Sequence, residues 1–244
     1  MIDFVSVAED FQLILKAVNA IEGFYSKNDS EIERLKNFLK ERDYYLINNI
    51  DYDLYGSTFN AAYYKKNLLK SLLFFREIFD LLPHEDITIR EIGCGAAPSS
   101  SALTLLYRKN FQREVSVELI DLSRKQLEYA IIILNSINIR IQNISVKSYD
   151  IKTDAAFSGL SIFSYFLCEQ DYHAGEALYQ SKNDMAGGFA VIDYETTINQ
   201  IQSYFLNEYD EKLVVINKCY SIPEELISLF GYEEITLHGC YYRA

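Results

Sequence analysis

Residues 87–95 read ITIREIGCG and residues 115–121 read VSVELID, and these two stretches decide the fold. The first is an apolar strand that runs into Gly93 and Gly95, and the second is an apolar strand that ends in Asp121. Glycines at a strand-to-helix turn let backbone N–H groups approach a ligand closely, and an acid that closes the next strand can accept hydrogen bonds from both hydroxyls of a ribose. The two stretches therefore predict a nucleoside-binding site.

The residues around the two glycines argue against a dinucleotide. In a GxGxxG turn the last position needs a very small residue so that the helix can pack on the strand, and here Pro98 occupies it. Proline suits the first turn of a helix, where its missing N–H would have no partner. NAD is therefore not expected, and the acid at Glu91 is placed to meet a positively charged amino group.

This E-x-G-x-G turn followed by a strand-end acid resembles the class I S-adenosylmethionine-dependent methyltransferases. The resemblance covers residues 87–244 and implies a Rossmann-like α/β fold, in which a seven-stranded, mostly parallel sheet has helices on both faces and an antiparallel last strand. Apolar, β-branched stretches separated by helix-length segments fit such a sheet. Strands are expected at 87–93, 115–121, 144–150, 160–166, 189–194, 212–218 and 233–242.

The resemblance implies S-adenosylmethionine as the cofactor. The backbone from Gly93 to Ala97 would lie against its methionine portion, with the helix N-terminus at 98–100 favouring the carboxylate. Ala97 replaces the third glycine of the family's loop. Asp121 matches the acid that holds the ribose hydroxyls, although an aspartate in this place is also a good helix N-cap.

Further cofactor contacts follow from the same resemblance. Leu122 would lie near the adenine, Asp150 would accept from the adenine amino group, and Ile151 would lie against the ring. The full expected cofactor set is Glu91, Gly93, Gly95, Ala97, Asp121, Leu122, Asp150, Ile151 and Ser164.

The fourth strand ends in SIFSYFLCEQDYH, residues 161–173. In open α/β sheets the ligand lies beyond the carboxyl ends of the strands, so Tyr165 and Tyr172 are placed to face cofactor or acceptor. His173 is the candidate general base and Glu169 the neighbouring carboxylate. An incidental surface histidine is the alternative for His173. The SYFLCE segment also resembles a methyltransferase group linked to the small ribosomal subunit, but that group's cysteine cluster is absent.

Residues 1–82 are expected to form a helical region for substrate recognition, and residues 83–244 the cofactor-binding domain. Ser30-x-x-Glu33 has the form of a capping box at a helix start. The turn-rich segment NNIDYDLYGSTF, residues 48–59, is expected to be mobile. Its tyrosines, Tyr52 and Tyr55, are candidates for a lid that closes over the site.

The composition narrows the range of possible binding partners. A formal charge of −12 and a pI near 4.8 make nucleic acid an unlikely partner, because its binding rests on Lys and Arg. The start MIDFVSVAED lacks a signal peptide's positive region, and no apolar run approaches about 18 residues, so we expect no membrane segment and a cytoplasmic location. The four cysteines form no CxxC pair, so neither a metal site nor a disulfide is expected.

The expected activity is methyl transfer from S-adenosylmethionine to a small-molecule or peptide acceptor. Two alternatives stay open. One keeps the cofactor and changes the reaction, as in aminocarboxypropyl transfer or in polyamine synthesis from the decarboxylated cofactor. The other is a non-catalytic, cofactor-binding regulatory or partner subunit, which would have its acceptor pocket filled by its own side chains. The acceptor atom and the oligomeric state are left open.

Overall fold

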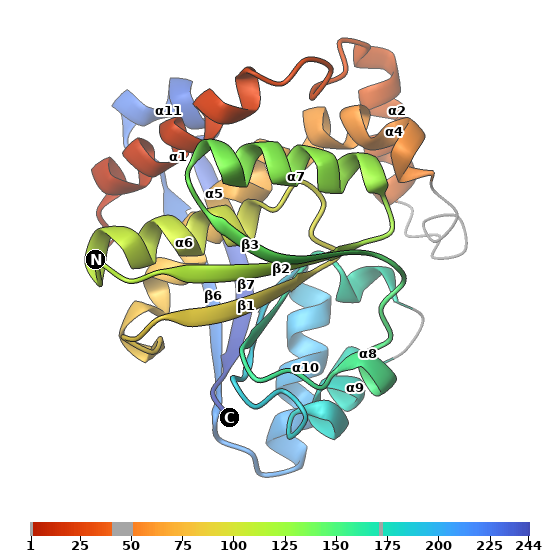
Figure 1. Cartoon of the computed structure of the whole chain (residues 1–244), viewed down its shortest axis with the longest axis vertical. Coiled ribbons are helices and arrows are strands. Elements are labelled where there is room, and N and C mark those ends of the chain that lie inside the picture. Colours follow the sequence, from red (N-terminus) through yellow and green to blue (C-terminus); the bar gives the residue numbers. More distant parts are fainter. Residues whose placement is uncertain (1, 41–50, 171–172) are drawn as a thin grey trace.

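The computed structural model describes residues 2–40, 51–170 and 173–244. Its helical elements lie around a central sheet (Figure 1). The α-helices are α1 (Phe4–Asn19), α2 (Asp29–Lys40), α4 (Tyr52–Phe59), α5 (Lys65–Glu77), α6 (Pro98–Asn110), α7 (Arg124–Ser136), α8 (Ile151–Asp154), α9 (Ala174–Ser181), α10 (Glu195–Asn207) and α11 (Glu224–Phe230). A π-helix, η1 (Asn60–Tyr64), joins α4 to α5, and two 3₁₀ turns are η2 (Phe79–Leu81) and η3 (Leu167–Glu169).

Seven strands form one sheet in the order β3-β2-β1-β4-β5-β7-β6. They are β1 (Ile87–Ile92), β2 (Val115–Asp121), β3 (Arg140–Val146), β4 (Leu160–Ser164), β5 (Phe189–Ile192), β6 (Leu213–Ser221) and β7 (Glu234–Tyr242). Strand β7 is antiparallel to both β5 and β6, and the other pairings are parallel. The predicted Rossmann-like fold, with its antiparallel last strand, is confirmed.

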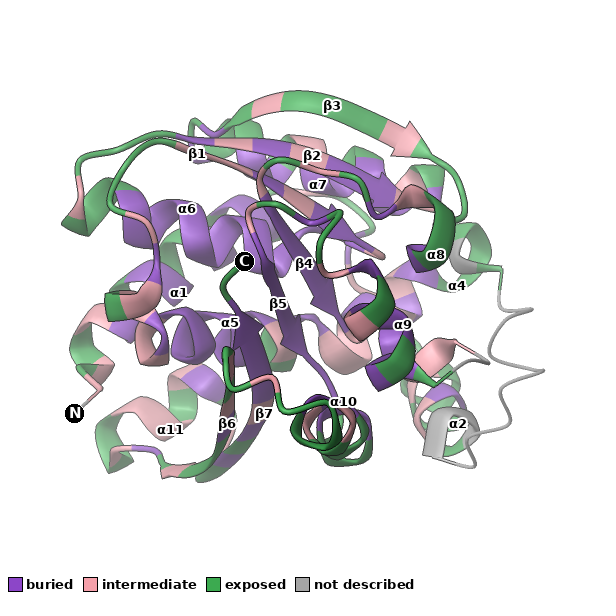
Figure 2. Ribbon diagram, turned by 90° about the horizontal axis from the view of Figure 1, so that it is seen from below, coloured by how far each residue is buried: buried purple, intermediate pink, exposed green. Residues whose placement is uncertain are grey.

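Helices cover both faces of the sheet, and each face has its own hydrophobic core. Helices α1, α5, α6 and α7 contribute to the larger core, and α8, α9 and α10 contribute to the smaller one (Figure 1). The central strands β4 and β5 are buried along their whole lengths, whereas the edge strand β3 is largely exposed (Figure 2). Central parallel strands need apolar residues on both faces, which explains why β4 and β5 read as continuous apolar runs.

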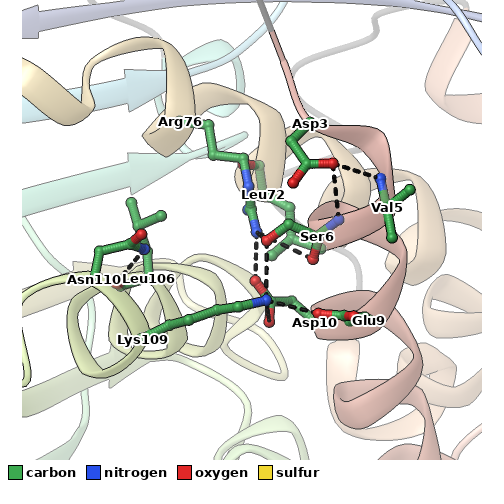
Figure 3. A network of polar contacts seen from close by, with 10 residues as sticks. All are labelled: Asp3, Val5, Ser6, Glu9, Asp10, Leu72, Arg76, Leu106, Lys109 and Asn110. Carbon is green, nitrogen blue, oxygen red and sulfur yellow. Dashed lines mark hydrogen bonds and ion pairs between the residues drawn. The ribbon is translucent and has the colours of Figure 1, made fainter.

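The N-terminal helix is tied to the rest of the larger core by a polar network (Figure 3). The guanidinium of Arg76 on α5 forms a nearly buried ion pair with Asp10 on α1 and donates to the carbonyl of Leu72 at 3.0 Å. On the rim, Lys109 of α6 pairs with Glu9 at 2.7 Å. Because α1 and α5 also belong to the larger core, the helices before residue 82 and the sheet after it share one hydrophobic interior. The division into two domains at 82/83 stays a prediction.

Two expectations about local structure need correction. The third strand occupies 140–146 rather than 144–150, and residues 151–154 instead form helix α8, with Asp150 as its N-cap. At the start of α2, the side chain of Asn28 accepts from the backbone N–H of Glu31 and the hydroxyl of Ser30, so Asn28, and not Ser30, acts as the cap. An asparagine satisfies the first N–H groups of a helix as well as serine does.

The segment predicted to be a turn-rich connection is largely helical where it is described. Residues 52–59 form α4, whose first N–H groups are capped by the carboxylate of Asp51. Residues 48–50 lie outside the described residues. The sequence Asp-Tyr-Asp-Leu-Tyr is a good helix start, because an aspartate N-cap and a second acid in the first turn both favour it.

In the part of the chain that the structure describes, no helix combines the length and the apolar character needed to cross a membrane.

Candidate functional site

A cavity of about 470 Å³ lies at the carboxyl ends of β1, β2 and β4. Its walls come from the loops that follow these strands and β3, and from the helical segment before β1. This volume falls within the usual range for small-molecule sites, which is about 300–1,000 Å³. The position is where open, mostly parallel sheets bind ligands.

The loop after β1 owes its shape to three left-handed residues. Gly93, Gly95 and Ala97 have φ values of 61°, 50° and 54°. A Cβ on Gly93 would meet the ring of Phe166 at 2.7 Å, so glycine is needed there for packing. A Cβ on Gly95 would have no described atom within 4 Å and would occupy the cavity. Ala97 keeps the left-handed conformation although it has a Cβ, and it is buried and forms no part of the wall.

Asp121 ends β2 and connects the loop after β1 to the start of α7. Its carboxylate accepts from the backbone N–H of Gly95 at 2.7 Å and from that of Ser123 at 2.8 Å. Burial raises the pKa of Asp121, and these backbone hydrogen bonds oppose that rise. The helix cap of α7 is Ser123, whose hydroxyl accepts from Gln126 at 3.1 Å, so Asp121 is not the N-cap. Asp121 lines the cavity, as does the exposed side chain of Leu122.

Glu91 lies in a different place from the one predicted. Its carboxylate is fully buried under the start of α6, where it accepts from the backbone N–H groups of Ser99 at 3.3 Å and Ser100 at 2.8 Å. It is not a wall residue of the cavity. Burial raises the pKa of Glu91 to about 7. Glu91 therefore caps a helix that begins with Pro98 and has no side-chain cap of its own.

This cap also changes the expected role of the α6 N-terminus. Because Glu91 already takes the N–H groups of Ser99 and Ser100, they do not point to a ligand carboxylate. A helix N-terminus attracts one anionic group, and here the protein supplies it.

The correction to β3 moves two more predicted residues away from the cavity. Asp150 caps α8 by accepting from Lys152 at 2.9 Å, and Ile151 is buried in the smaller core. The wall at the end of β3 is formed instead by Lys147, Ser148 and Tyr149. Because the strand ends four residues earlier than predicted, the residues that follow its end are also earlier.

The end of β4 contributes the residues that the sequence predicted there. Ser164, Tyr165 and Glu169 all line the cavity. Tyr165 has a φ of 56°, which is uncommon for a residue with a large side chain and marks local strain. Its ring packs edge-on against Tyr194, with the centroids 5.5 Å apart.

His173 does not contribute to the cavity. It is exposed at the start of α9, where its Nδ1 accepts from the backbone N–H of Glu176 at 3.3 Å. Its ring lies 5.8 Å from that of Tyr204. The structure therefore does not bring His173 to the described cavity wall, and its role as a general base stays a prediction. Tyr172 lies outside the described residues.

Helix α4 covers one side of the cavity. Its residue Asp53 accepts from the hydroxyl of Ser123 at 2.6 Å and from the backbone N–H of Lys125 at 3.1 Å, and these bonds lower the pKa of Asp53. Gln126 donates to the carbonyl of Gly56 at 3.0 Å. Tyr55 is 44% exposed and is not a wall residue, and the side chain of Tyr52 lies outside what is described.

The helical wall of the cavity includes residues that the sequence analysis did not single out for it. Asn60 and Tyr64 of η1, and Asn67 one turn later, line the cavity. Single π-turns inside helices are frequent at functional sites, but no sequence pattern predicts them. Tyr64 is 3% exposed, and its hydroxyl has no hydrogen-bond partner among the described residues. The aspartates at 51 and 53 could have been found from the helix-start pattern.

Across the described ranges, no group of three or more His, Cys, Asp and Glu side chains is placed to hold a metal ion.

No protein-family model and no curated protein matches the chain. Solved structures with a similar fold include a methyltransferase from Pyrococcus furiosus, with 14% identity over 70% of this chain and 82% of that one and a TM-score of 0.45. A precorrin-6y methyltransferase from Geobacter metallireducens has 9% identity over 72% and 88% of the two chains, with a TM-score of 0.48. A SAM-dependent methyltransferase from Aquifex aeolicus has 14% identity over 68% and 87%, with a TM-score of 0.40. At identities and scores this low, the fold assignment rests on the strand order of the chain itself.

Proposed function

We propose that the chain is an enzyme that binds S-adenosylmethionine in this cavity and transfers its methyl group to a small-molecule or peptide acceptor. The observation that carries the proposal is the placement of Asp121 at the end of β2, on the cavity wall and hydrogen-bonded to Gly95. An acid in this place, beside a glycine turn, is suited to a ribose.

The hydrogen bonding of Asp121 leaves it able to bind hydroxyls. An ionised carboxylate offers about four acceptor positions. Gly95 and Ser123 supply one donor each. A pair of adjacent ribose hydroxyls can therefore donate to the same carboxylate, while the backbone bonds hold its orientation.

The surroundings of Asp121 fit the rest of such a cofactor. The space over Gly95 admits a ligand where any side chain would intrude. Leu122 offers an apolar surface for a base inside the same cavity. When bound, S-adenosylmethionine supplies a methyl group on a positively charged sulfur, and its transfer leaves the C–S electron pair on that sulfur.

The protein's own part in methyl transfer is to align the reactants and exclude water, since the sulfonium is already activated. Ser164, Tyr165 and Glu169 at the end of β4 are the residues we assign to the acceptor side of the cavity. The cavity that these residues line is open to a ligand, whereas a non-catalytic subunit was expected to fill this space with its own side chains. That observation favours an enzyme.

The products distinguish the candidate reactions. Purified protein is incubated with S-adenosylmethionine and mixed acceptor candidates, and the nucleoside product is identified by mass spectrometry. Methyl transfer releases S-adenosylhomocysteine, and aminocarboxypropyl transfer releases methylthioadenosine. Tight cofactor binding without either product supports the regulatory alternative. Glu91, which was expected to meet the amino group of the cofactor, does not reach the cavity, so it does not distinguish the intact from the decarboxylated cofactor.

A further inference from the structure

The charges on the cavity wall are unbalanced. Among the described wall residues there are four carboxylates, from Asp51, Asp53, Asp121 and Glu169, and one ammonium, that of Lys147. That ammonium is paired with Asp154 at 3.1 Å, which is not a wall residue. The described wall is therefore strongly acidic.

The carboxylates divide between two ends of the cavity. Asp51 caps α4, and Asp53 and Asp121 bind backbone N–H groups around the start of α7, so all three lie at the end that we assign to the nucleoside. Glu169 lies after β4, on the side that we assign to the acceptor. An anionic acceptor would have to approach this carboxylate, and like charges at short range are unfavourable.

Aromatic rings form much of the remaining wall. Tyr64, Tyr149, Tyr165 and Phe166 line the cavity, the last two directly before the turn that carries Glu169. The faces of aromatic rings attract cations, and a carboxylate beside them adds a charge-assisted hydrogen bond.

We propose that the methyl acceptor is a small primary amine, bound as its ammonium ion by the Glu169 carboxylate against the aromatic wall of the cavity. This inference rests on the proposed function and specifies its substrate. The proton that the ammonium must lose before its nitrogen can accept a methyl group would pass to a carboxylate oxygen of Glu169.

One cation lies close to this region, outside the wall. The Nζ atom of Lys70 is 5.6 Å from the centre of the Tyr165 ring, and Lys70 is 8% exposed. It is attracted to the buried Asp193, a charge of opposite sign. Neither Lys70 nor Asp193 lines the cavity, so neither is counted among the charges of the wall.

Three probes of one shape and different charge test the inference. Benzylamine, benzyl alcohol and benzoate are titrated at pH 7 into protein saturated with S-adenosylhomocysteine, and binding is followed by NMR chemical-shift changes. We expect benzylamine to bind at least about tenfold more tightly than benzyl alcohol, as one charge-assisted hydrogen bond implies, and benzoate to bind most weakly. Equal binding of the three, or a preference for benzoate, would overturn the inference.

Two variants locate the effect. Glu169→Gln should weaken benzylamine binding about tenfold and leave the binding of benzyl alcohol and S-adenosylhomocysteine unchanged. Glu176→Gln, on α9 outside the cavity wall, is the matched control and should change none of them. An unchanged benzylamine affinity in Glu169→Gln also counts against the inference. If the Glu169→Gln variant does not fold, the order of the three binding affinities in the unaltered protein still decides whether the inference holds.

Binding of S-adenosylhomocysteine and preference for the amine test the proposed function and this inference separately. If S-adenosylhomocysteine does not bind, the proposed function falls and this inference falls with it. If it binds and the amine is not preferred, the inference alone is wrong.

Discussion

The carboxylate of Asp121 accepts a hydrogen bond from the backbone N–H of Gly95 at 2.7 Å. This bond fixes the end of β2 against the loop that follows β1, and both residues line the same cavity. Position 121 therefore shapes the loop and presents a carboxylate to a ligand at the same time.

Replacing Asp121 should weaken cofactor binding. Asp121→Ala is expected to cost about 1–3 kcal/mol of S-adenosylhomocysteine binding free energy, the range for leaving hydrogen-bonding groups unpaired. The measurement is isothermal titration calorimetry. Asp150→Ala is the matched control, since Asp150 caps α8 and is not itself a wall residue, and it should lower stability without changing affinity. Equal loss of affinity in both variants would show that Asp121 has no specific role.

A side chain at Gly95 should exclude the cofactor. Gly95→Val places a branched side chain in the cavity and in a left-handed conformation, which costs about 1–2 kcal/mol of stability on its own. Gly231→Val carries the same strain, with a φ of 82° and no described atom near the new Cβ, but it lies at the end of α11. We expect both variants to lose stability in thermal unfolding and only Gly95→Val to lose S-adenosylhomocysteine binding. Normal binding by Gly95→Val would place the site elsewhere.

Glu91 should make the stability of the protein depend on pH. Burial raises its pKa from 4.5 to about 7 in the folded state. Below pH 4.5 the carboxyl is protonated in both states, and between about 4.5 and 7 it ionises in the unfolded chain while the folded protein still holds the proton. The unfolding free energy should therefore fall as pH rises through this window, by about 3 kcal/mol from this group.

The variant Glu91→Gln isolates this contribution. Urea unfolding at pH values between about 4.5 and 7.5 should show a smaller loss of stability with rising pH than in the unaltered protein, since glutamine does not titrate. Burial also raises the pKa of Asp193 to about 6. Such other buried acids contribute the same pH dependence of stability to the variant and to the unaltered protein. Identical pH slopes in the two proteins would contradict a buried, titrating Glu91.

The hydroxyl of Tyr64 should have opposite effects on stability and on binding. It is buried without a partner in the described ranges, so Tyr64→Phe should raise the stability of the free protein by about 1 kcal/mol. If the hydroxyl serves a ligand, the same change should weaken ligand binding. Tyr107→Phe is the control, because that hydroxyl donates to the carbonyl of Pro83 at 2.7 Å and its removal should lower stability. Chemical unfolding with and without S-adenosylhomocysteine measures both effects, and a destabilised Tyr64→Phe would refute the argument.

The sequence predicted the sheet and the centre of the site because both have strong local signals. Buried strands such as β4 read as continuous apolar runs, and the glycine turn needs left-handed residues at Gly93 and Gly95. The edge strand β3 is mostly exposed and pairs with β2 through a register shift, so its apolar pattern is weak. Because the strand was predicted to end at residue 150, Asp150 and Ile151 were wrongly placed in the predicted site.

Other errors arose because the partner of a side chain is set by tertiary structure. Nothing local indicates that Glu91 turns toward the first N–H groups of α6, eight residues further along the chain. The missing side-chain cap on that helix was the available signal. The wall residues of η1 could not be predicted, because a π-turn shifts the helix face by a fraction of a turn without a sequence mark.

The position of the nucleoside can be seen in a crystal structure of the protein with S-adenosylhomocysteine. We expect the nucleoside at the end of β2, with both ribose hydroxyls within about 3.2 Å of the Asp121 carboxylate and the base beside Leu122. A ligand bound outside this cavity, or a ribose held by other groups while Asp121 binds only Gly95 and Ser123, would contradict it.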